Sequence, residues 1–372
     1  WSSTLASPLR VMLVDDSAVA RGFIRRWVES EPDIVIVASL HTGREAIECV
    51  ERVDPDVVVL DVAMPDMDGI TVLPLLLRKK PGLAVIMAST LTRKNAEVTM
   101  RALSLGAVDC IQKPDAQGVV TSEDYRQALI TKFRELGARS RRRLNPRAIL
   151  RPVSMLAPRE RPALDVEQRA LVLRSASAVT PRVLVIGSST GGPQALNEVC
   201  CHLGAVIETV PVLIAQHMPP TFTTILAEHL ARVTGYPARE AEDGEPLLAG
   251  RIYVAPGHRH LRIGRINGQA VARLDDSGPV HFCKPSVDVL FSSAAAVFGA
   301  AALGVVLTGM GTDGLDGGRD IVEAGGTLLA QDESTSVVWG MPGSVAQAGL
   351  CSRILPLSQI APAILQAFGR RA

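Results

Sequence analysis

Short apolar runs alternate with longer amphipathic stretches along the first third of the chain. The five runs read VMLVDD, IVIVAS, DVVVLD, AVIMAS and VDCIQKP, and apolar residues in the intervening segments recur at helical spacing. A short continuous apolar run indicates a strand buried on both faces, whereas the longer period indicates a helix. The pattern predicts a parallel α/β domain of five strand–helix units between Leu9 and about Phe133.

The alternation of strand-like and helix-like segments is interrupted in the middle of the chain and resumes after it. The stretch RSRRRLNPRAILRPVSMLAPRERP, which begins at Arg139, is dense in Arg and Pro and has no sustained apolar period, so we predict a linker over residues 136–181. A second series starts at Arg182, with strands predicted at VLVIG, VPVLIAQ, RIYVA, ALGVVLT and GTLLAQ. We therefore predict two doubly wound parallel-sheet domains of the α/β class, over residues 1–135 and 182–372.

Composition limits the kinds of partner that the chain can have. The longest apolar run, residues 294–307, is shorter than a membrane span and contains Gly299 and Gly304, so it predicts a buried helix followed by a strand and no membrane insertion. A net charge of +1 gives no reason to expect nucleic acid as a partner. No charged-then-apolar leader opens the sequence, which favours a cytoplasmic location. The six cysteines include no C-x-x-C pair, so neither a structural metal nor a disulfide framework is expected.

Polar residues close four of the first five predicted strands. Asp15 and Asp16 follow the first, Asp61 ends the third, Ser89 ends the fourth and Lys113 follows the fifth. A single Asp at a strand end is usually a turn former or a helix cap, but carboxyl ends of parallel strands share one rim, where these side chains would converge. Crowded carboxylates suit Mg²⁺, and a carboxylate beside a metal, a hydroxyl and an ammonium suits phosphoryl chemistry.

The motifs LVDDS, LDVAMPDMDG and a final KP resemble the receiver domain of two-component response regulators, over about 125 residues. The resemblance implies a flavodoxin-like fold, phosphorylation at Asp61 by a histidine kinase as phosphodonor, and a switch formed by Ser89 and Lys113. It also implies Mg²⁺ held by the three aspartates at positions 15, 16 and 61. The chain departs from the family at Cys110, where an aromatic switch residue is usual, and at Ala63, where a polar residue is common.

A second constellation begins in VLVIGSSTGGPQAL. The segment GSSTGG fits neither the dinucleotide fingerprint nor the phosphate-binding P-loop, and no lysine follows it. It does fit G-x-S-x-G centred on Ser189, a pattern whose small residues permit a sharp turn from strand to helix that exposes the hydroxyl. Pro193 suits the first turn of the following helix. Ser189 is therefore the candidate nucleophile.

Such a serine needs a base, and the base needs a carboxylate to orient it. His217 directly follows the predicted strand VPVLIAQ and would lie on the same rim as Ser189, while His258 and His260 follow another strand and are rivals. An isolated histidine after a strand is more often structural than catalytic. Asp313 follows a third buried strand and is the candidate carboxylate.

The other histidines and acidic residues are weaker candidates for the base and for the carboxylate that orients it. His202 and His229 fall in helical stretches and His281 in a loop. Asp316 and Asp320 lie in helix-like sequence, where an acid is solvated or caps the helix.

The chain order of serine, histidine and acid disfavours an α/β-hydrolase, which places the acid before the histidine. The motifs GSSTGGPQAL, QHMPPTFT, APGHRHL, PSVDVLF, LTGMGTDGLDG and WGMPGSV together resemble the catalytic domain of the CheB family of chemotaxis receptor methylesterases. The resemblance implies a Rossmann-like domain that hydrolyses glutamate methyl esters on methyl-accepting chemoreceptors and deamidates glutamines, without a cofactor. Ser189, His217 and Asp313 match the family's triad.

Further site residues come from the same resemblance. Thr190 and Met310 match positions that border the reacting carbonyl, and His260 matches a position that lines the site. A receiver placed before a hydrolase also suggests that the unphosphorylated receiver covers the serine rim.

Two other functions stay open from the residues. One is a receiver-controlled esterase or amidase that acts on another protein. The other is a phosphorylation-dependent binding module whose second domain has lost catalysis, which the intact triad argues against.

Overall fold

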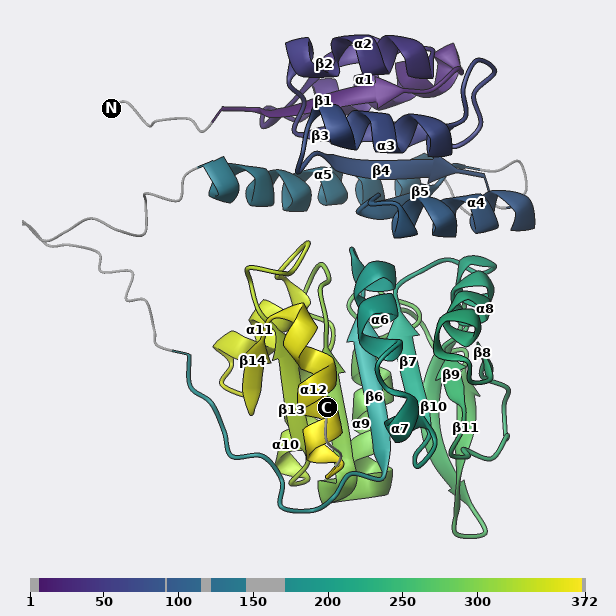
Figure 1. Cartoon of the computed structure of the whole chain (residues 1–372), viewed down its shortest axis with the longest axis vertical. Helices are drawn as coiled ribbons and strands as arrows, with labels where there is room; N and C mark the ends of the chain where they lie inside the picture. Colours follow the sequence, from purple (N-terminus) through teal and green to yellow (C-terminus); the bar gives the residue numbers. More distant parts are fainter. Residues whose placement is uncertain (1–6, 91, 115–121, 145–170, 370–372) are drawn as a thin grey trace, which may run out of the picture.

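The first of two parallel sheets is formed by the amino-terminal part of the chain (Figure 1). The computed structural model describes residues 7–90, 92–114, 122–144 and 171–369. The strands are β1 (Leu9–Val14), β2 (Ile34–Leu40), β3 (Val57–Asp61), β4 (Ala84–Ser89) and β5 (Asp109–Gln112), in the order β2-β1-β3-β4-β5. All five predicted strands are confirmed. The order reverses between β1 and β3, so their carboxyl ends flank the crevice where a doubly wound sheet places its site.

Side-chain caps explain where most helices of this domain begin. The helices are α1 (Ala18–Glu29), α2 (Gly43–Val53), α3 (Gly69–Lys79), α4 (Arg93–Ser104) and α5 (Ser122–Leu144). Ser17, Thr42, Asp68 and Thr92 each accept a hydrogen bond from the amide three residues later. Such a bond satisfies one of the amides that a helix start leaves unpaired.

The second sheet has seven strands, all in parallel pairs. They are β6 (Val183–Ser188), β7 (Val212–Gln216), β8 (Ala238–Glu240), β9 (Ile252–Val254), β12 (Ala302–Val306), β13 (Thr327–Gln331) and β14 (Arg353–Leu355), in the order β14-β13-β12-β6-β7-β9-β8. The five predicted strands are confirmed. The two edge strands, β8 (ARE) and β14 (RIL), were not predicted, because both are partly exposed and contain charged residues, whereas the equally short β9 (IYV) is buried and apolar.

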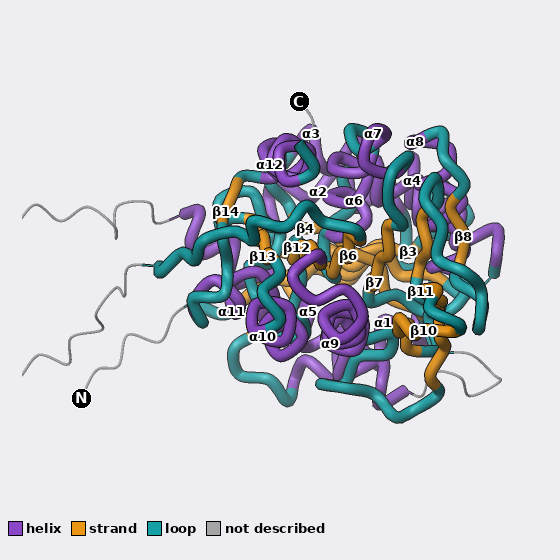
Figure 2. The backbone as a smooth tube through the Cα atoms, turned by 90° about the horizontal axis from the view of Figure 1, so that it is seen from below, coloured by secondary structure: helices purple, strands orange, loops and turns teal. Residues whose placement is uncertain are grey.

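Helices cover both faces of this sheet. They are α6 (Gly192–Cys200), α7 (Gly204–Ile207), α8 (Phe222–Thr234), α9 (Val287–Phe298), α10 (Leu315–Glu323), α11 (Met341–Gln347) and α12 (Leu357–Ala367), with a 3₁₀ turn, η2 (Gly299–Ala301), before β12. In Figure 2, α6 and α12 lie on one side of the strands and α9 and α10 on the other. An antiparallel hairpin of β10 (His260–Ile266) and β11 (Gln269–Asp275) completes the unit. The predicted fold class, two doubly wound α/β domains, is confirmed.

The segment predicted as a linker is only partly described. Helix α5 continues to Leu144, and residues 145–170 lie outside the described residues. The chain from 171 follows the second domain: Arg174 N–H donates to Cys351 O at 2.9 Å and Ser177 Oγ to Ala300 O at 2.9 Å. The domain limits at 135 and 181 stay predictions.

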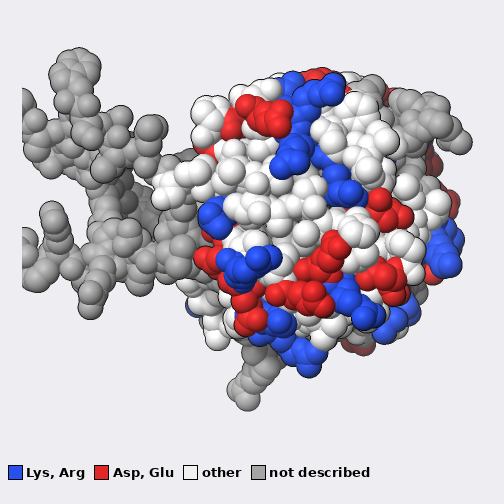
Figure 3. Space-filling model, turned by 90° about the horizontal axis from the view of Figure 1, so that it is seen from above, with Lys and Arg blue, Asp and Glu red and all other residues white. Residues whose placement is uncertain are grey.

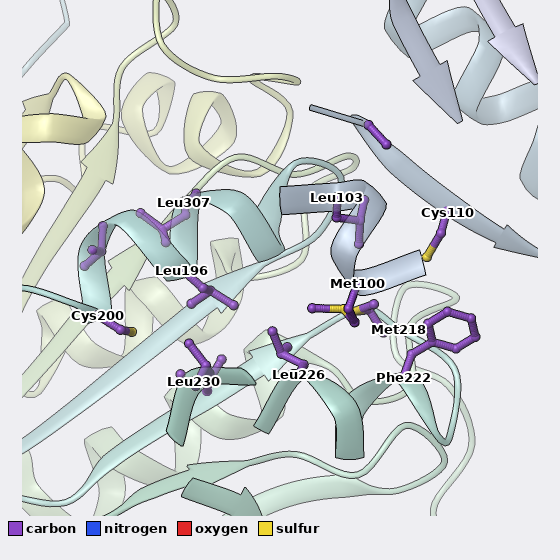
Figure 4. Close-up of a cluster of buried hydrophobic side chains, with 14 of the residues drawn as sticks. Met100, Leu103, Cys110, Leu196, Cys200, Met218, Phe222, Leu226, Leu230 and Leu307 are labelled. Carbon is purple, nitrogen blue, oxygen red and sulfur yellow. The ribbon is translucent and has the colours of Figure 1, made fainter. Parts of the chain in front are cut away.

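Apolar packing joins the two domains. A continuous cluster of buried side chains runs from Met100 and Leu103 on α4 to Leu196 on α6 and to Phe222 and Leu226 on α8 (Figure 4). Burial of apolar surface contributes about 25 cal/mol per Å². The domains are therefore held by the same type of contact that forms each core.

The outer surface carries both signs of charge. Seen from above, Lys and Arg side chains are interspersed with Asp and Glu (Figure 3). Within the described residues, no helix combines the length and the apolar character that a bilayer crossing requires.

A close approach at Gly69 gives a test of the receiver packing. A Cβ on Gly69 would lie 2.2 Å from the backbone oxygen of Asp61, whereas a Cβ on Gly22, within α1, would meet nothing within 4 Å. We expect Gly69→Ala to lower the free energy of unfolding of this domain by about 1–3 kcal/mol, because backbone must shift to make room. Urea unfolding of the full chain measures it. Gly22→Ala is the matched control and should be neutral or stabilising by up to about 1 kcal/mol; equal unfolding midpoints for the two variants would contradict the packing argument.

Candidate active site

Ser189 lies in a sharp turn between β6 and α6. The turn reverses at Gly191, whose φ of 77° lies in the left-handed region that favours glycine. A Cβ on Gly192 would come within 2.0 Å of Gln216 Oε1, so only glycine fits beside that side chain. Ser189 N–H donates to Thr308 O at 3.0 Å, and Gln216 Nε2 donates to Ser189 O at 2.9 Å. The small residues of GSSTGG are therefore required by close packing around the serine.

His217 lies beside this turn because β6 and β7 are neighbours. Ser188 pairs with Gln216 at the carboxyl ends of the two strands, and the His217 amide donates to Ser188 O at 3.1 Å. The His217 side chain is 14% exposed, which leaves one edge of the ring accessible.

Asp313 orients the imidazole. His217 Nε2 lies 2.7 Å from Asp313 Oδ2. The carboxylate also accepts from Ser286 Oγ at 2.8 Å and from the backbone N–H groups of Val287 at 2.7 Å and Asp288 at 2.9 Å. These donors belong to the amino-terminal end of α9, where the helix dipole favours negative charge. Burial alone would raise the pKa of Asp313, but the hydrogen bond from His217 and these donors hold it well below its usual range.

The second nitrogen of the ring faces a cysteine. Cys283 Sγ lies 3.6 Å from His217 Nδ1, and no hydrogen bond between Ser189 Oγ and His217 is found among the described residues. Burial opposes a charge on the ring, yet the hydrogen bond to Asp313 and the contact with Cys283 raise the pKa of His217. The structure thus joins His217 to Asp313 and places Ser189 on the adjacent strand end, with the serine–histidine contact still to be made.

Thr190 and Met310 lie against the receiver. Thr190 Oγ1 donates to Asp109 Oδ2 at 2.6 Å, and the Gly191 amide donates to Val108 O at 3.0 Å. Met310 packs against a buried apolar cluster that is formed by receiver side chains together with Val338 of the second domain. Val108, just before β5, and Asp109, its first residue, therefore accept hydrogen bonds from the turn that carries Ser189.

The other predicted residues of this domain lie elsewhere. His260 is fully buried, with Nε2 at 3.0 Å from Gly278 O and Nδ1 accepting from the Ser286 amide at 3.1 Å. Both its ring nitrogens are thus bonded to backbone groups, one of them the amide of Ser286, whose hydroxyl donates to Asp313. The rival His258 is exposed on the turn before β10.

More polar contacts join the domains at the rim. Arg93 Nη2 lies 2.7 Å from Glu228 Oε1, and Gln194 Nε2 donates to Ala107 O at 2.9 Å and to Leu103 O. With the apolar cluster of Figure 4, these contacts hold the α4 and β5 side of the receiver against the carboxyl ends of β6 and β7.

The acidic residues of the receiver converge as expected. Ligand oxygens of Asp15, Asp16 and Asp61 all lie within 4.8 Å of one another. Lys113 Nζ lies 2.7 Å from Asp15 Oδ2 and 2.8 Å from Asp61 Oδ2. Burial raises the pKa of Asp61, against the opposing effect of Lys113. Ser89 is buried at the end of β4. Three carboxylates at this spacing form an oxygen donor set that fits Mg²⁺.

Sequence reasoning missed several residues that shape the site. Gln216, Ser286 and Cys283 were not singled out, although each contacts the serine turn, Asp313 or His217. The position of Gln216 at the end of VPVLIAQ, one residue before His217, was a usable signal. Nothing local in the sequence marks Cys283.

Comparison with known proteins agrees with both domains. A family model for the CheB methylesterase matches residues 184–364, and one for the response regulator receiver domain matches residues 11–122. A protein-glutamate methylesterase/protein-glutamine glutaminase of Rhodopseudomonas palustris (strain BisB5) is 54% identical over 99% of this chain and 96% of its own. The chain belongs to the CheB family.

Two further CheB proteins are also similar to this chain. A protein-glutamate methylesterase/protein-glutamine glutaminase of Nitrobacter hamburgensis is 56% identical over 97% of this chain and 94% of its own length. The crystal structure of the Thermotoga maritima CheB methylesterase catalytic domain is 38% identical, with a TM-score of 0.49, over 50% of this chain and 99% of that one. The resemblance seen in the motifs is confirmed.

The contact of Cys283 with the ring of His217 should raise the pKa of that ring, which can be tested. We expect the pKa of His217 to lie above the ordinary value of about 6.5 and to fall in Cys283→Ala, because the sulfur no longer favours the protonated ring. Histidine ring resonances followed by NMR against pH measure it, with His217→Gln to assign the signal. Cys201→Ala, which removes an exposed thiol just after the end of α6, is the control. The same His217 pKa in wild type and Cys283→Ala would show that the sulfur has no influence.

Proposed function

We propose that this chain is a phosphorylation-regulated protein-glutamate methylesterase that also deamidates glutamines. Its substrates are methyl-accepting chemoreceptors, from which it releases methanol and restores glutamate, in the cytoplasm. One observation carries the proposal. The imidazole of His217 is held by Asp313 and follows β7, the strand next to β6, which leads into the turn that carries Ser189. The reaction, on glutamate and glutamine side chains of a protein, is the one named for relatives at 54% and 56% identity. Chemoreceptors as the substrate are what the family resemblance implies.

The reaction is acyl transfer in two steps. Because Asp313 holds Nε2, Nδ1 is the nitrogen of His217 that takes the proton from Ser189 Oγ as that oxygen attacks the ester carbonyl. The imidazolium then protonates the departing methanol, and water hydrolyses the glutamyl ester on Ser189 by the same route. Asp313 stabilises the imidazolium throughout. For this to occur, Ser189 Oγ must take the place of Cys283 Sγ beside Nδ1.

Backbone amides at the turn over residues 190–191 supply oxyanion stabilisation. They stand at the start of α6, where N–H groups and the helix dipole favour negative charge. In the described arrangement the Gly191 amide donates to Val108 O of the receiver. The receiver therefore inhibits by two means: it covers the rim, and it occupies a donor that the transition state needs.

Phosphorylation at Asp61 relieves this inhibition. We assign Mg²⁺ binding to Asp15, Asp16 and Asp61, where the ion would offset charge on the phosphoryl group received from a histidine kinase. Lys113 and Ser89 form the switch. Lys113 directly follows β5, the strand whose first residue, Asp109, accepts from Thr190. A shift of Lys113 toward the phosphoryl group would therefore move the strand that contacts the serine turn.

Strand β5 is not fully satisfied in its present position. Both polar side-chain atoms of Gln112 are buried without a hydrogen-bond partner among the described residues. Such groups carry a desolvation penalty of about 1–3 kcal/mol, which favours a second arrangement of β5.

In this proposal the receiver comprises residues 1–135, the linker residues 136–181 and the catalytic domain residues 182–372.

Removal of the nucleophile tests the enzyme assignment. We expect Ser189→Ala to lower methanol release from a methylated receptor by several orders of magnitude, because loss of a triad member removes most of the catalysis. The assay compares the full chain and the variant, each with and without a small-molecule phosphodonor. Near-normal release by Ser189→Ala would refute the assignment. Wild-type activity on a generic ester but none on the receptor would favour another protein as substrate, and no hydrolysis by wild type would favour a binding module.

A charge swap tests the inhibitory contact. Arg93 and Glu228 form an exposed ion pair, so reversing either charge replaces attraction with repulsion. We expect Arg93→Glu and Glu228→Arg each to raise the basal activity of the unphosphorylated chain by about two- to fivefold, and the double variant to restore inhibition. Lys79→Glu, which breaks a pair with Glu51 inside the receiver, is the matched control. Basal activity that stays at the wild-type level in both single variants would count against inhibition through this face.

A further inference from the structure

Three side chains with metal-ligating atoms converge outside the proposed triad. His281 Nε2 lies 3.6 Å from Asp288 Oδ2 and 3.4 Å from Asp316 Oδ2, and one ligand atom of each residue lies within 4.8 Å of the other two. His281 belongs to the loop before α9, Asp288 to the first turn of α9 and Asp316 to the first turn of α10. Helices α9 and α10 pack against each other and are adjacent in Figure 2.

Asp288 supplies a buried oxygen without a donor. The residue is 5% exposed, and its Oδ1 accepts from the amides of Gly314 at 2.9 Å and Gly317 at 2.7 Å. Its Oδ2 is buried and has no hydrogen-bond partner in the described part of the chain, although it faces His281. Burial, and next the charge of Asp313, raise the pKa of Asp288 to about 7. A positive charge at this point would offset both effects.

The two other side chains direct free atoms toward that oxygen. Asp316 Oδ1 accepts from Arg319 Nη1 at 2.9 Å, which leaves Oδ2 facing His281. His281 and Phe282 both have left-handed φ angles, of 49° and 63°, an unfavourable conformation for such residues. The loop therefore folds back in a way that carries the His281 ring over the two carboxylates.

We propose that His281, Asp288 and Asp316 form a binding site for a divalent transition-metal ion, with Zn²⁺ as the best match. His281 Nε2 lies 3.4–3.6 Å from the two carboxylate oxygens, so bonds of about 2.1 Å to a zinc ion would make ligand–zinc–ligand angles of about 108–118°, close to the tetrahedral value. An imidazole with two carboxylates suits zinc better than Mg²⁺ or Ca²⁺, which prefer oxygen ligands alone. Asp316 and His281 are partly exposed, so a water can take the fourth position.

The site adjoins the proposed catalytic carboxylate. The Asp288 amide donates to Asp313 Oδ1 at 2.9 Å, and the loop of His281 also carries Cys283, which contacts His217. A bound ion would tie this loop to α9 and α10 and reduce the repulsion between Asp288 and Asp313. It stabilises the arrangement around the triad and takes no part in proton transfer, and the proposal does not depend on the substrate.

Zinc binding is measured on the full chain after treatment with a chelator. Excess Mg²⁺ stays present throughout, so that the receiver carboxylates do not compete for zinc. Equilibrium dialysis should find one Zn²⁺ per chain, with affinity at least tenfold weaker in His281→Ala and in Asp316→Asn. Glu323→Gln, an exposed acid on α10 outside the cluster, is the matched control and should bind as wild type does. Zinc should also raise the unfolding temperature of wild type but not of His281→Ala.

One competing zinc site must be distinguished, because His217 and Cys283 also lie close together. Cys283→Ser should keep the bound ion, and Co²⁺ in place of Zn²⁺ should give a spectrum without the thiolate-to-metal charge-transfer band. Loss of binding in Cys283→Ser with full binding in His281→Ala would overturn the proposal in favour of the His217–Cys283 pair. Absence of binding by wild type would overturn it too, and would leave the cluster as a set of polar contacts between His281 and two carboxylates.

Discussion

The carboxylate of Asp313 is the interaction on which the rest of the catalytic domain depends. It accepts from His217 Nε2, from Ser286 Oγ and from two backbone amides at the start of α9. A buried carboxylate is costly unless it is paired and fully hydrogen-bonded, and here four donors meet that requirement. One group therefore fixes the ring of His217, anchors the first turn of α9 and places Asp288 beside α10.

Parallel strand direction explains why the functional side chains gather. In both sheets the carboxyl ends share one rim, so residues far apart in sequence are brought together when each follows a strand. In the receiver this rule unites Asp15, Asp61 and Lys113; in the second domain it unites Ser189 and His217. The same architecture therefore occurs twice in the chain. Its rim carries carboxylates and a lysine in the receiver, and a serine and a histidine in the second domain.

The boundary between the domains combines strong and weak contacts. The apolar cluster of α4, α6 and α8 provides broad attraction, whereas the contacts made by Asp109 and Val108 are few and directed at the serine turn. Hydrogen bonds of this kind contribute only about 0.5–1.5 kcal/mol each, so a modest shift of β5 suffices to break them. In the proposed mechanism, that difference would allow the receiver to release the turn without either domain unfolding.

Much of this organisation follows from the sequence alone. Ten of the strands are marked by short apolar runs, because a strand covered by helices on both faces must be apolar at most of its positions. The motifs around Asp61, Ser189, His217 and Asp313 likewise identify the family, since those side chains follow strand ends that the pattern locates. Edge strands β8 and β14 were not predicted because their short, partly exposed sequences, ARE and RIL, contain charged residues and form no apolar run.

Only the tertiary structure decided what surrounds these residues. The sequence favours His217 and leaves His258 and His260 as rivals. Folding buries the ring of His260 between backbone groups and leaves His258 exposed. Cys283 beside the imidazole, Asp109 on the serine turn and the convergence of His281, Asp288 and Asp316 likewise depend on loops and domains that meet across long stretches of chain. Local pattern reports which face of an element is buried, because burial follows the period of the backbone. It carries no information on which distant loop covers that face, because packing between elements decides it.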